Sequence, residues 1–428
     1  MTDMLYLEIV PGAWRPERIL TMDNKKQTFR TDNDSVGQVR FDNDFFCSWF
    51  DGKLPRAIPT TRPGFWAKTI ELWHSQGHLA VGEDPCDKVG LDVQLAEDHT
   101  CPMFLGMDPA FDIEILEQDE NYVTFRDDTD ILQKMHSKDF DRTKGLFENA
   151  GMAEGMSHWL EHPVKDIASW KAIYEKRFRP NMEERLSKRW RKKLEGLNGN
   201  ADAAFLKGEI NNFPFFGTFG MLRHLVGAEP LMYMFYENPS LIRTILSDML
   251  EFWMTLWGSF FDKYGNVIGR VHFFEDMCYK GGPFISPDTF NEFLAPVYTE
   301  LIGFFKGNGV TVFSVDSDGN AMIIIPELLK CGVNMFMPLE VQCGMDAAAC
   351  RDAFGELFLY GGMDKRVLNQ GTSEIDEELN RCFTTAYKKG RYWPAFDHSI
   401  PPIPWENWIY FTRRYKQYSA SSALVNKQ

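Results

Sequence analysis

Acidic residues follow five short apolar runs in the second half of the chain, and a histidine ends the last of these groups. The groups, in chain order, are Glu275 and Asp276, Asp316 and Asp318, Glu340, Asp364 and Lys365, and Asp397 and His398. A single aspartate at such a position is often only the N-cap of the next helix. Asp316 and Asp318 in "VFSVDSDGN" (312–320) cannot both cap the same helix. We therefore expect a functional cluster rather than a set of caps.

Two kinds of chemistry suit these residue types. Crowded carboxylates repel one another at neutral pH, so they must share protons, pair with cations or bind a metal ion. Asp318, Glu340 and His398 offer an oxygen, oxygen and nitrogen ligand set that suits zinc or another divalent ion. A cluster of this kind without a metal suits proton transfer instead. In both cases the candidate catalytic residues are Asp276, Asp316, Asp318 and His398.

Three other side chains near these groups have simpler explanations. Cys278 and Cys343 are candidate ligands or nucleophiles, although free thiols are more often inert packing residues. Cys343 is kept as an additional candidate metal ligand because it lies three residues after Glu340. His272 lies inside the run before Glu275, where a hydrogen-bonded core histidine is the simpler explanation.

Phenylalanines are concentrated in "NNFPFFGTFG" (211–220). Core packing explains most aromatic residues of this kind, but a pocket with aromatic walls would favour a flat or apolar substrate over a sugar or a phosphate. The candidate substrate-binding residues are Phe213, Phe216 and Phe219 from this segment, and Glu275, Asp364 and Lys365 from the acidic groups.

Strands and helices in alternation must position these residues. From about residue 205 onward, a short apolar run that ends in polar residues is followed each time by a helical segment. The predicted strands are 204–210, 270–276, 310–316, 333–340, 356–364 and 391–396. Regular alternation predicts a parallel sheet. These units, with further ones expected in the first half, favour a (β/α)8 TIM barrel, in which the active site lies at the C-terminal ends of the strands.

The first part of the chain is less regular. We interpret 1–130 as an N-terminal extension with early barrel elements, among them a helix at 65–77 and a hairpin strand at 121–130. Residues 131–428 are then expected to form the (β/α)8 barrel.

Composition and the absence of several motifs argue against other functions. No GxGxxG or GxxxxGK[ST] motif supports a dinucleotide or P-loop site, and a net charge of −15 disfavours nucleic-acid binding. The eight cysteines include no CxxC pair, and the first residues, "MTDMLYLEIVPGAW", lack a signal-peptide pattern. No apolar run approaches the ~20 residues that span a bilayer. We expect a cytoplasmic protein without membrane contact, with a homodimer among the expected assemblies.

Five stretches of the C-terminal half resemble the uroporphyrinogen decarboxylase superfamily, which also contains zinc- and cobalamin-dependent methyltransferases. They are "FFEDMCYKGGPFISPDTFNEFLAPVYTELIGFFKGNGV", "VDSDGN", "CGVNMFMPLEVQCGMD", "LYGGMDKRVL" and "PAFDHSIPPIPWENW". They occur in the family order, and "LPRAIPTTRPGFWAKTIELWHSQG" (54–77) looks like the family's early segment. The resemblance implies a (β/α)8 barrel with its site in the C-terminal mouth.

Two branches of the superfamily fit this chain less well. Decarboxylases that act on the tetrapyrrole hold several carboxylates with an arginine-rich early loop, where this chain has only Arg56 and Arg62. The thiol-methylating branch binds zinc through a His-x-Cys motif where this chain has Asp316-Ser317-Asp318, and through a later cysteine where it has His398. The positions match, but the ligand types differ.

The chain is most similar to the methyltransferase components of corrinoid-dependent O-demethylases. This resemblance implies that the methyl group of a methoxylated aromatic, or of a related donor, passes to the cobalt of a separate corrinoid protein. It also implies a divalent metal, for which we expect zinc, that polarises the ether oxygen. The chain has no DxHxxG corrinoid-binding motif, so the cobalamin is expected to arrive on the partner protein.

Two alternatives remain open. A metal-free decarboxylase acting on a small aromatic or pyrrolic acid would use His398 and an aspartate to move protons. A non-catalytic binding barrel would bind its ligand without turnover and would tolerate Asp318→Asn.

Overall fold

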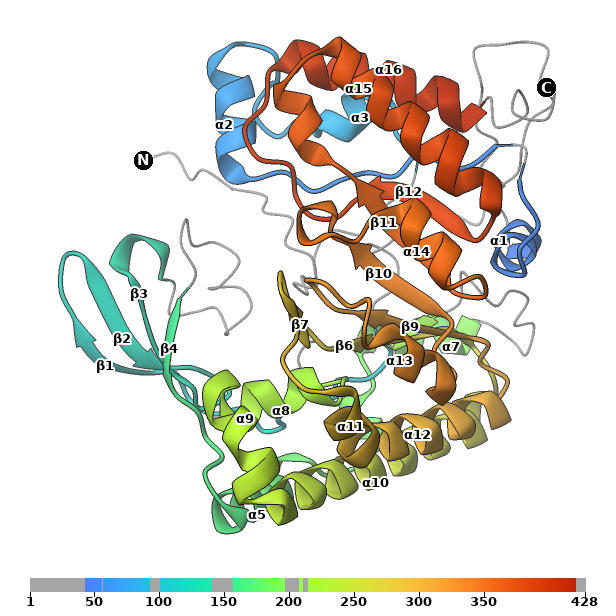
Figure 1. The fold of residues 1–428 in the computed structure, drawn as a ribbon. Coiled ribbons are helices and arrows are strands. Elements are labelled where there is room, and N and C mark those ends of the chain that lie inside the picture. Colours follow the sequence, from blue (N-terminus) through green and yellow to red (C-terminus); the bar gives the residue numbers. More distant parts are fainter. Residues whose placement is uncertain are drawn as a thin grey trace.

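A six-stranded parallel sheet lies at the centre of the computed structural model (Figure 1). The structure describes residues 43–55, 57–92, 101–140, 157–196, 208–210 and 215–420. The strands of this sheet are β5 (Gly208–Ile210), β6 (Ile268–Phe274), β9 (Val312–Asp316), β10 (Met335–Leu339), β11 (Phe358–Met363) and β12 (Tyr392–Phe396). Their order across the sheet, β12-β11-β10-β9-β6-β5, follows their order along the chain. This succession is that of a singly wound barrel sheet, because a doubly wound sheet reverses direction at its middle.

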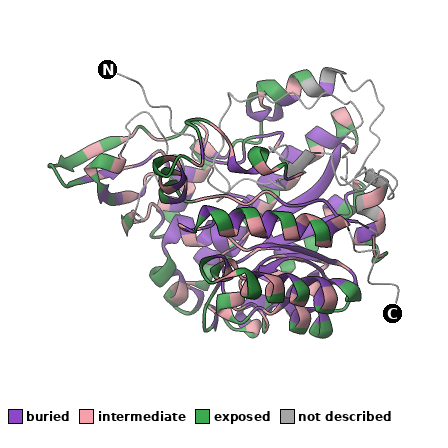
Figure 2. Cartoon of the chain, turned by 90° about the horizontal axis from the view of Figure 1, so that it is seen from above, coloured by how far each residue is buried: buried purple, intermediate pink, exposed green. Residues whose placement is uncertain are grey.

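Helices connect successive strands of the sheet and cover it (Figure 1). The main ones are α10 (Pro239–Tyr264), α12 (Ala295–Gly307), α13 (Ile325–Cys331), α14 (Ala347–Ala353), α15 (Thr372–Asn380) and α16 (Trp405–Ala420). Asn238 caps α10 by accepting the N–H of Leu241, and proline occupies the first helical position. Figure 2 shows the strands of the parallel sheet mostly buried and the outer faces of the helices exposed. None of the helices in the described ranges is long and apolar enough to cross a bilayer.

A second sheet, antiparallel and four-stranded, stands at one side of the molecule (Figure 1). Its strands are β1 (Glu114–Gln118), β2 (Tyr122–Arg126), β3 (Leu132–His136) and β4 (His158–Glu161). Val123, Phe125 and Met135 form a small core of its own. A hydrogen bond between His224 Nε2 and Thr129 Oγ1 (3.1 Å) ties the sheet to the main body.

The predicted parallel α/β sheet is confirmed, with a strand in each of the six predicted runs. Among the described residues β5 and β12 are the edges of this sheet, so these residues do not close an eight-stranded barrel. The helix expected at 65–77 is α2 (Ala67–Ser75), and the strand expected at 121–130 is β2. A division of the chain at residue 130 falls between β2 and β3, which pair with each other. The extent of the N-terminal extension stays a prediction.

Candidate active site

The acidic groups that follow the apolar runs lie at one edge of the parallel sheet. Asp316 is the last residue of β9, and Asp318 follows two positions later. Glu340, Asp364 and Asp397 come directly after β10, β11 and β12. Because parallel strands all point the same way, their C-terminal ends meet at one edge, which is where a barrel places its active site.

Asp318, Glu340 and His398 form the first of two side-chain clusters, here called the Asp318 cluster. His398 Nε2 lies 3.0 Å from Asp318 Oδ1, and its Nδ1 lies 3.6 Å from Glu340 Oε1. One potential ligand atom from each residue lies within 4.8 Å of the other two. The three side chains are between 17% and 43% exposed, so a ligand can reach them. The structure therefore brings together the three residues predicted as metal ligands.

Glu340 also anchors the loop that carries Asp318. Its Oε2 accepts the backbone N–H of Gly319 (2.6 Å) and the thiol of Cys343 (3.2 Å). The carboxylate thus holds the loop after β9 against the end of β10. Its other oxygen, Oε1, faces His398.

His398 is held in its charged form by the carboxylates around it. Burial alone would lower the pKa of His398, but hydrogen bonds with Asp318 and Asp397 outweigh it and raise the pKa to about 10. The imidazole is therefore protonated at neutral pH in the absence of a cation. A divalent ion between the carboxylates would replace that proton, because metal ligands bind in their deprotonated form. Two carboxylates and one imidazole are a donor set that fits zinc and leaves a coordination position open.

Asp276, Asp316 and Asp318 form the second cluster, here called the Asp276 cluster, with one carboxylate oxygen of each within 4.8 Å of the others. Burial raises the pKa of Asp276 to about 6, and the charges of Asp318 and Asp316 act in the same direction. Arg223 opposes this shift by pairing with Asp276. Since Asp318 belongs to both clusters, the two form one continuous acidic site.

Two basic side chains contact carboxylates of the Asp276 cluster. Arg223, on α8 (Phe219–Val226), lies 2.8 Å from Asp276 Oδ2 and also donates to the backbone carbonyl of Asp276 (3.3 Å). His272 Nε2 lies 3.5 Å from Asp316 Oδ2, and its Nδ1 lies 2.8 Å from Ser314 Oγ. His272 is buried and hydrogen-bonded as expected, but it also contacts the site.

Glu275, predicted to bind substrate, holds the start of α8 instead. It is fully buried, and its carboxylate accepts the N–H groups of Thr218 (2.7 Å), Phe219 (2.6 Å) and Gly220 (2.9 Å). The hydroxyl groups of Thr218 and Tyr298 donate to it as well. Both oxygens are used inside the fold, because a helix start leaves backbone donors that need acceptors. The side chain is closed off from a ligand at the mouth.

The aromatic wall predicted from the phenylalanine-rich segment is not a pocket surface in the described residues. Phe216 is fully buried between the sheet and the helices, with Phe273 at 5.4 Å and Trp253 at 5.3 Å between ring centroids. Phe219 is also fully buried. Phe213 lies outside the described residues. For the two that are described, core packing is the correct explanation.

A short hairpin places other aromatic rings beside the acidic site. Strands β7 (Cys278–Tyr279) and β8 (Gly282–Pro283) follow β6, and the hairpin leaves Tyr279 53% and Phe284 42% exposed. The two rings lie 5.3 Å apart. The backbone N–H of Asn320 donates to the carbonyl of Tyr279 (2.9 Å), so the hairpin rests on the loop that carries Asp318.

The remaining predicted substrate-binding residues are engaged with partners of their own. Asp364 pairs with Arg366 (2.6 Å) and accepts that residue's backbone N–H. Lys365 Nζ pairs with Asp397 Oδ1 at 2.9 Å. Asp364 therefore stabilises its own turn. Lys365 lies close to His398, the residue after Asp397.

The two thiols near the site are protonated at neutral pH. Burial raises the pKa of Cys278 to about 12. Burial and the carboxylate of Glu340 raise the pKa of Cys343 to about 11. Cys343 nevertheless stands next to the Asp318 cluster through its contact with Glu340.

Sequence reasoning missed Arg223 and the Tyr279 hairpin. Arg223 lies in the middle of a helix, "FGMLRHLV", whose other residues apart from His224 are apolar, and a permanent charge in such a segment is a usable signal. The hairpin turn is marked by the glycines of "YKGG", where Gly282 has a φ of 136°.

Comparison with known proteins gives one family. Residues 215–418 match the uroporphyrinogen decarboxylase (URO-D) family, and no curated relative matches the chain. Among solved structures, a methyltransferase from Methanosarcina mazei is 17% identical with a TM-score of 0.42, over 62% of this chain and 73% of that one. A B12-independent methionine synthase from Shewanella sp. W3-18-1 is 11% identical with a TM-score of 0.34, over 88% and 96% of the two chains. Both similarities are distant, so the function must be argued from the residues of the site.

Proposed function

We propose that this chain is a methyltransferase of the uroporphyrinogen decarboxylase superfamily, whose family pattern residues 215–418 match. It takes a methyl group from a methoxylated aromatic and passes it to the cobalt of a separate corrinoid protein. The observation that carries the proposal is the convergence of Asp318, Glu340 and His398 at the C-terminal ends of three parallel strands. The six strands are taken as part of a (β/α)8 barrel whose mouth holds this site.

Asp318, Glu340 and His398 would hold the divalent metal, for which zinc is the proposed ion. Cys343 donates to Glu340 and is the additional candidate ligand, although its sulfur does not lie within 4.8 Å of a ligand atom of all three residues. A bound ion would supply Lewis-acid polarisation of the ether oxygen, which makes the aromatic oxygen a better leaving group. Glu340 gives the site rigidity, because the same carboxylate fixes the loop of Asp318 through Gly319.

Asp276 is the proposed proton donor. A carboxyl group whose pKa is raised to about 6 is partly protonated near neutral pH, and Arg223 fixes its orientation. As the bond between the methyl carbon and the aromatic oxygen breaks, the electron pair stays on the oxygen, and the reduced corrinoid of the partner would be the methyl acceptor. That oxygen takes the proton from Asp276, and the products are a phenol and a methylated corrinoid.

Tyr279 and Phe284 are the proposed contact surface for the aromatic ring. They are exposed, adjacent and attached to the loop of Asp318. Aromatic side chains in this position favour a flat ligand through stacking or edge contacts. Tyr279→Ala should therefore raise KM for the donor with a smaller change in kcat. Tyr236→Ala, a change at an exposed tyrosine of α9 (Ala228–Glu237), should leave both unchanged.

The test is a methyl-transfer assay with a methoxylated aromatic, a reduced corrinoid protein and zinc. We expect methylated corrinoid with the wild-type chain and a loss of about 100-fold or more in Asp318→Ala and His398→Ala. Glu327→Gln, which alters an ion pair with Lys330 on α13, is the matched control and should keep full activity. Absence of transfer across a panel of methoxylated donors would contradict the proposal.

A metal-free decarboxylase is the second candidate, and one observation favours it. His398 is protonated at neutral pH and lies 3.0 Å from Asp318, which is an arrangement that can deliver a proton to carbon after loss of CO2. The two candidates differ in their response to a chelator. Release of CO2 from an aromatic or pyrrolic acid that persists in excess chelator would select the decarboxylase.

A further inference from the structure

A buried ion pair lies behind His398. Lys365 Nζ is 2.9 Å from Asp397 Oδ1, and the two side chains are only 13% and 3% exposed. The same oxygen accepts the backbone N–H of His398 (2.7 Å) and lies 4.0 Å from its Nδ1. Asp397 thus accepts the backbone N–H of the histidine and lies beside its ring, and the charge of Lys365 balances that of Asp397.

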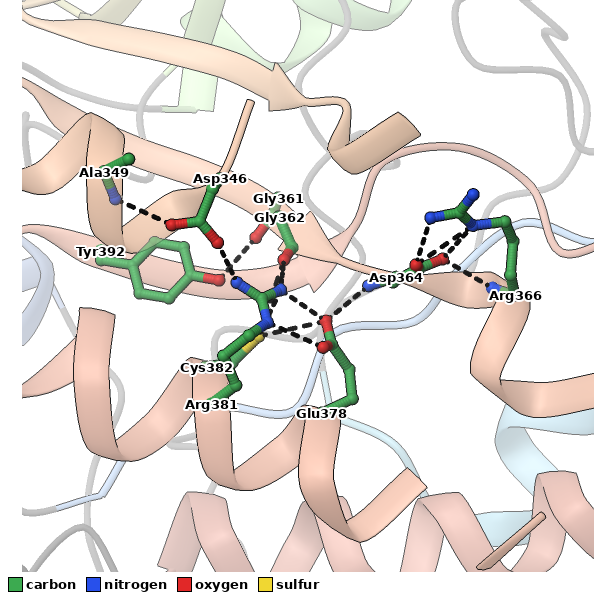
Figure 3. A network of polar contacts seen from close by, with 10 residues as sticks. All are labelled: Asp346, Ala349, Gly361, Gly362, Asp364, Arg366, Glu378, Arg381, Cys382 and Tyr392. Atoms are coloured by element: carbon green, nitrogen blue, oxygen red, sulfur yellow. Dashed lines mark hydrogen bonds and ion pairs between the residues drawn. The ribbon is translucent and has the colours of Figure 1, made fainter. Parts of the chain in front are cut away.

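The strand end that carries Lys365 is itself fixed by a polar network (Figure 3). Glu378 Oε1 accepts the backbone N–H of Asp364 (2.7 Å), so a residue of α15 holds the position just before Lys365. Arg381 donates to both oxygens of Glu378, with Nη2 to Oε1 at 2.6 Å and Nε to Oε2 at 2.8 Å. It also donates to the carbonyl of Gly362 (2.8 Å).

The chain direction at this strand end depends on two glycines. Gly361 and Gly362 have φ values of 109° and 76°, which side-chain-bearing residues rarely adopt. A Cβ on Gly361 would lie 2.7 Å from the backbone nitrogen of Leu339. The backbone conformation at the end of β11 therefore requires these glycines, and two residues after the strand Lys365 pairs with Asp397 at the end of β12.

A buried carboxylate needs a partner, because an unpaired charge away from water is strongly unfavourable. A histidine that binds a metal through one ring nitrogen commonly has a carboxylate or carbonyl near its other ring nitrogen, which fixes the orientation of the ring. Loss of such a partner typically lowers metal affinity about 10–100-fold. Asp397 occupies that place for His398. Lys365 keeps the carboxylate there, and Glu378 and Arg381 keep Lys365 in place.

We propose that Lys365 and Asp397, supported by Glu378 and Arg381, are positioning residues that orient His398 and thereby set the metal affinity of the Asp318 cluster. The proposal rests on the proposed function, since it needs the metal site. It assigns Lys365 to the histidine rather than to the substrate.

The experiment measures zinc affinity by competition with a chelator of known affinity, using zinc alone and the full-length chain. Lys365→Met and Asp397→Asn should weaken zinc binding by about 10–100-fold. Lys365→Arg, which keeps the charge, should recover part of the loss. Lys389→Met is the matched control, because Lys389 also pairs with an aspartate, Asp352, but on the surface, and it should bind zinc as the wild type does.

Cobalt(II) absorption gives a second measurement that a purely structural role would not move. A displaced histidine changes the ligand field, so the visible bands of the cobalt(II) form should change in Asp397→Asn even where urea unfolding of the metal-free protein shows a folded chain. If Lys365→Met does not fold, Asp397→Asn and Lys365→Arg carry the test.

The outcomes separate this proposal from the proposed function. Zinc binding by the wild type, with affinities within about twofold in all folded variants, would overturn the positioning role alone. A wild-type chain that binds no zinc would overturn the metal-assisted function, and the positioning role with it.

Discussion

The carboxylate of Glu275 provides the sharpest stability prediction, because five donors converge on one buried side chain. In Glu275→Gln, one oxygen becomes an amide group that donates hydrogen bonds and cannot accept them. If that group replaces Oε2, the N–H groups of Phe219 and Gly220 lose their acceptor. Each buried donor left without a partner costs about 1–3 kcal/mol. Removal of a buried charge offsets part of this cost, and we expect a net loss of roughly 2–4 kcal/mol.

Urea unfolding measures this loss as a lower midpoint at an unchanged m-value. Glu292→Gln is the matched control, because Glu292 is 57% exposed and pairs with Arg243 on the surface. Such surface pairs contribute about 0–1 kcal/mol. A loss below ~1 kcal/mol in Glu275→Gln would show that this carboxylate does not hold the start of α8.

Two further predictions concern backbone space and pH. In Gly220→Ala the new Cβ would lie 2.3 Å from the carbonyl oxygen of Phe274, so chemical denaturation should show a loss above ~2 kcal/mol in the free energy of unfolding. Gly258→Ala is the control, because a Cβ at this position inside α10 meets no neighbouring atom within 4 Å. It should raise the free energy of unfolding by up to ~1 kcal/mol. Burial raises the pKa of Asp127 from 3.8 to about 6, so its stabilising contribution is lost as pH rises through about 6. The free energy of unfolding of Asp127→Asn should therefore rise relative to that of the wild type by up to ~3 kcal/mol between about pH 4 and about pH 7, whatever the constant cost of the donors that the amide leaves unpaired, and parallel pH curves would contradict this.

The parts of the fold that could be predicted from sequence are those set by local pattern. Buried parallel strands appear as short apolar runs, and the first polar residues after them mark the C-terminal edge of the sheet. This is why the sequence alone predicts that Asp318, Glu340 and His398 lie together, as they do in the structure. The resemblance to the uroporphyrinogen decarboxylase superfamily agrees with the match over residues 215–418.

The parts that could not be predicted depend on backbone angles and tertiary packing. Glu275 and Asp276 are neighbours in sequence, but Asp276 has a φ of 43°, and the turn sends one carboxylate to the buried start of α8 and the other to the mouth. In the sequence, Phe216 and Phe219 cannot be distinguished from phenylalanines that line a pocket. The packing of Phe216 against α10 and β6 shows that this residue belongs to the core. Of the antiparallel sheet, the sequence predicts only the strand that forms β2, because the pairing of strands depends on residues that are distant in the chain.

The most direct test of the account is anomalous diffraction at the zinc edge from crystals of the full chain grown with zinc. If these three side chains bind zinc, a peak lies between Asp318, Glu340 and His398, with zinc to oxygen and zinc to nitrogen distances of about 2.0–2.2 Å. Crystals of His398→Ala grown in the same way should lack that peak. A wild-type structure with no zinc at this position, or with His398 still paired to Asp318 while zinc binds elsewhere, would contradict the account.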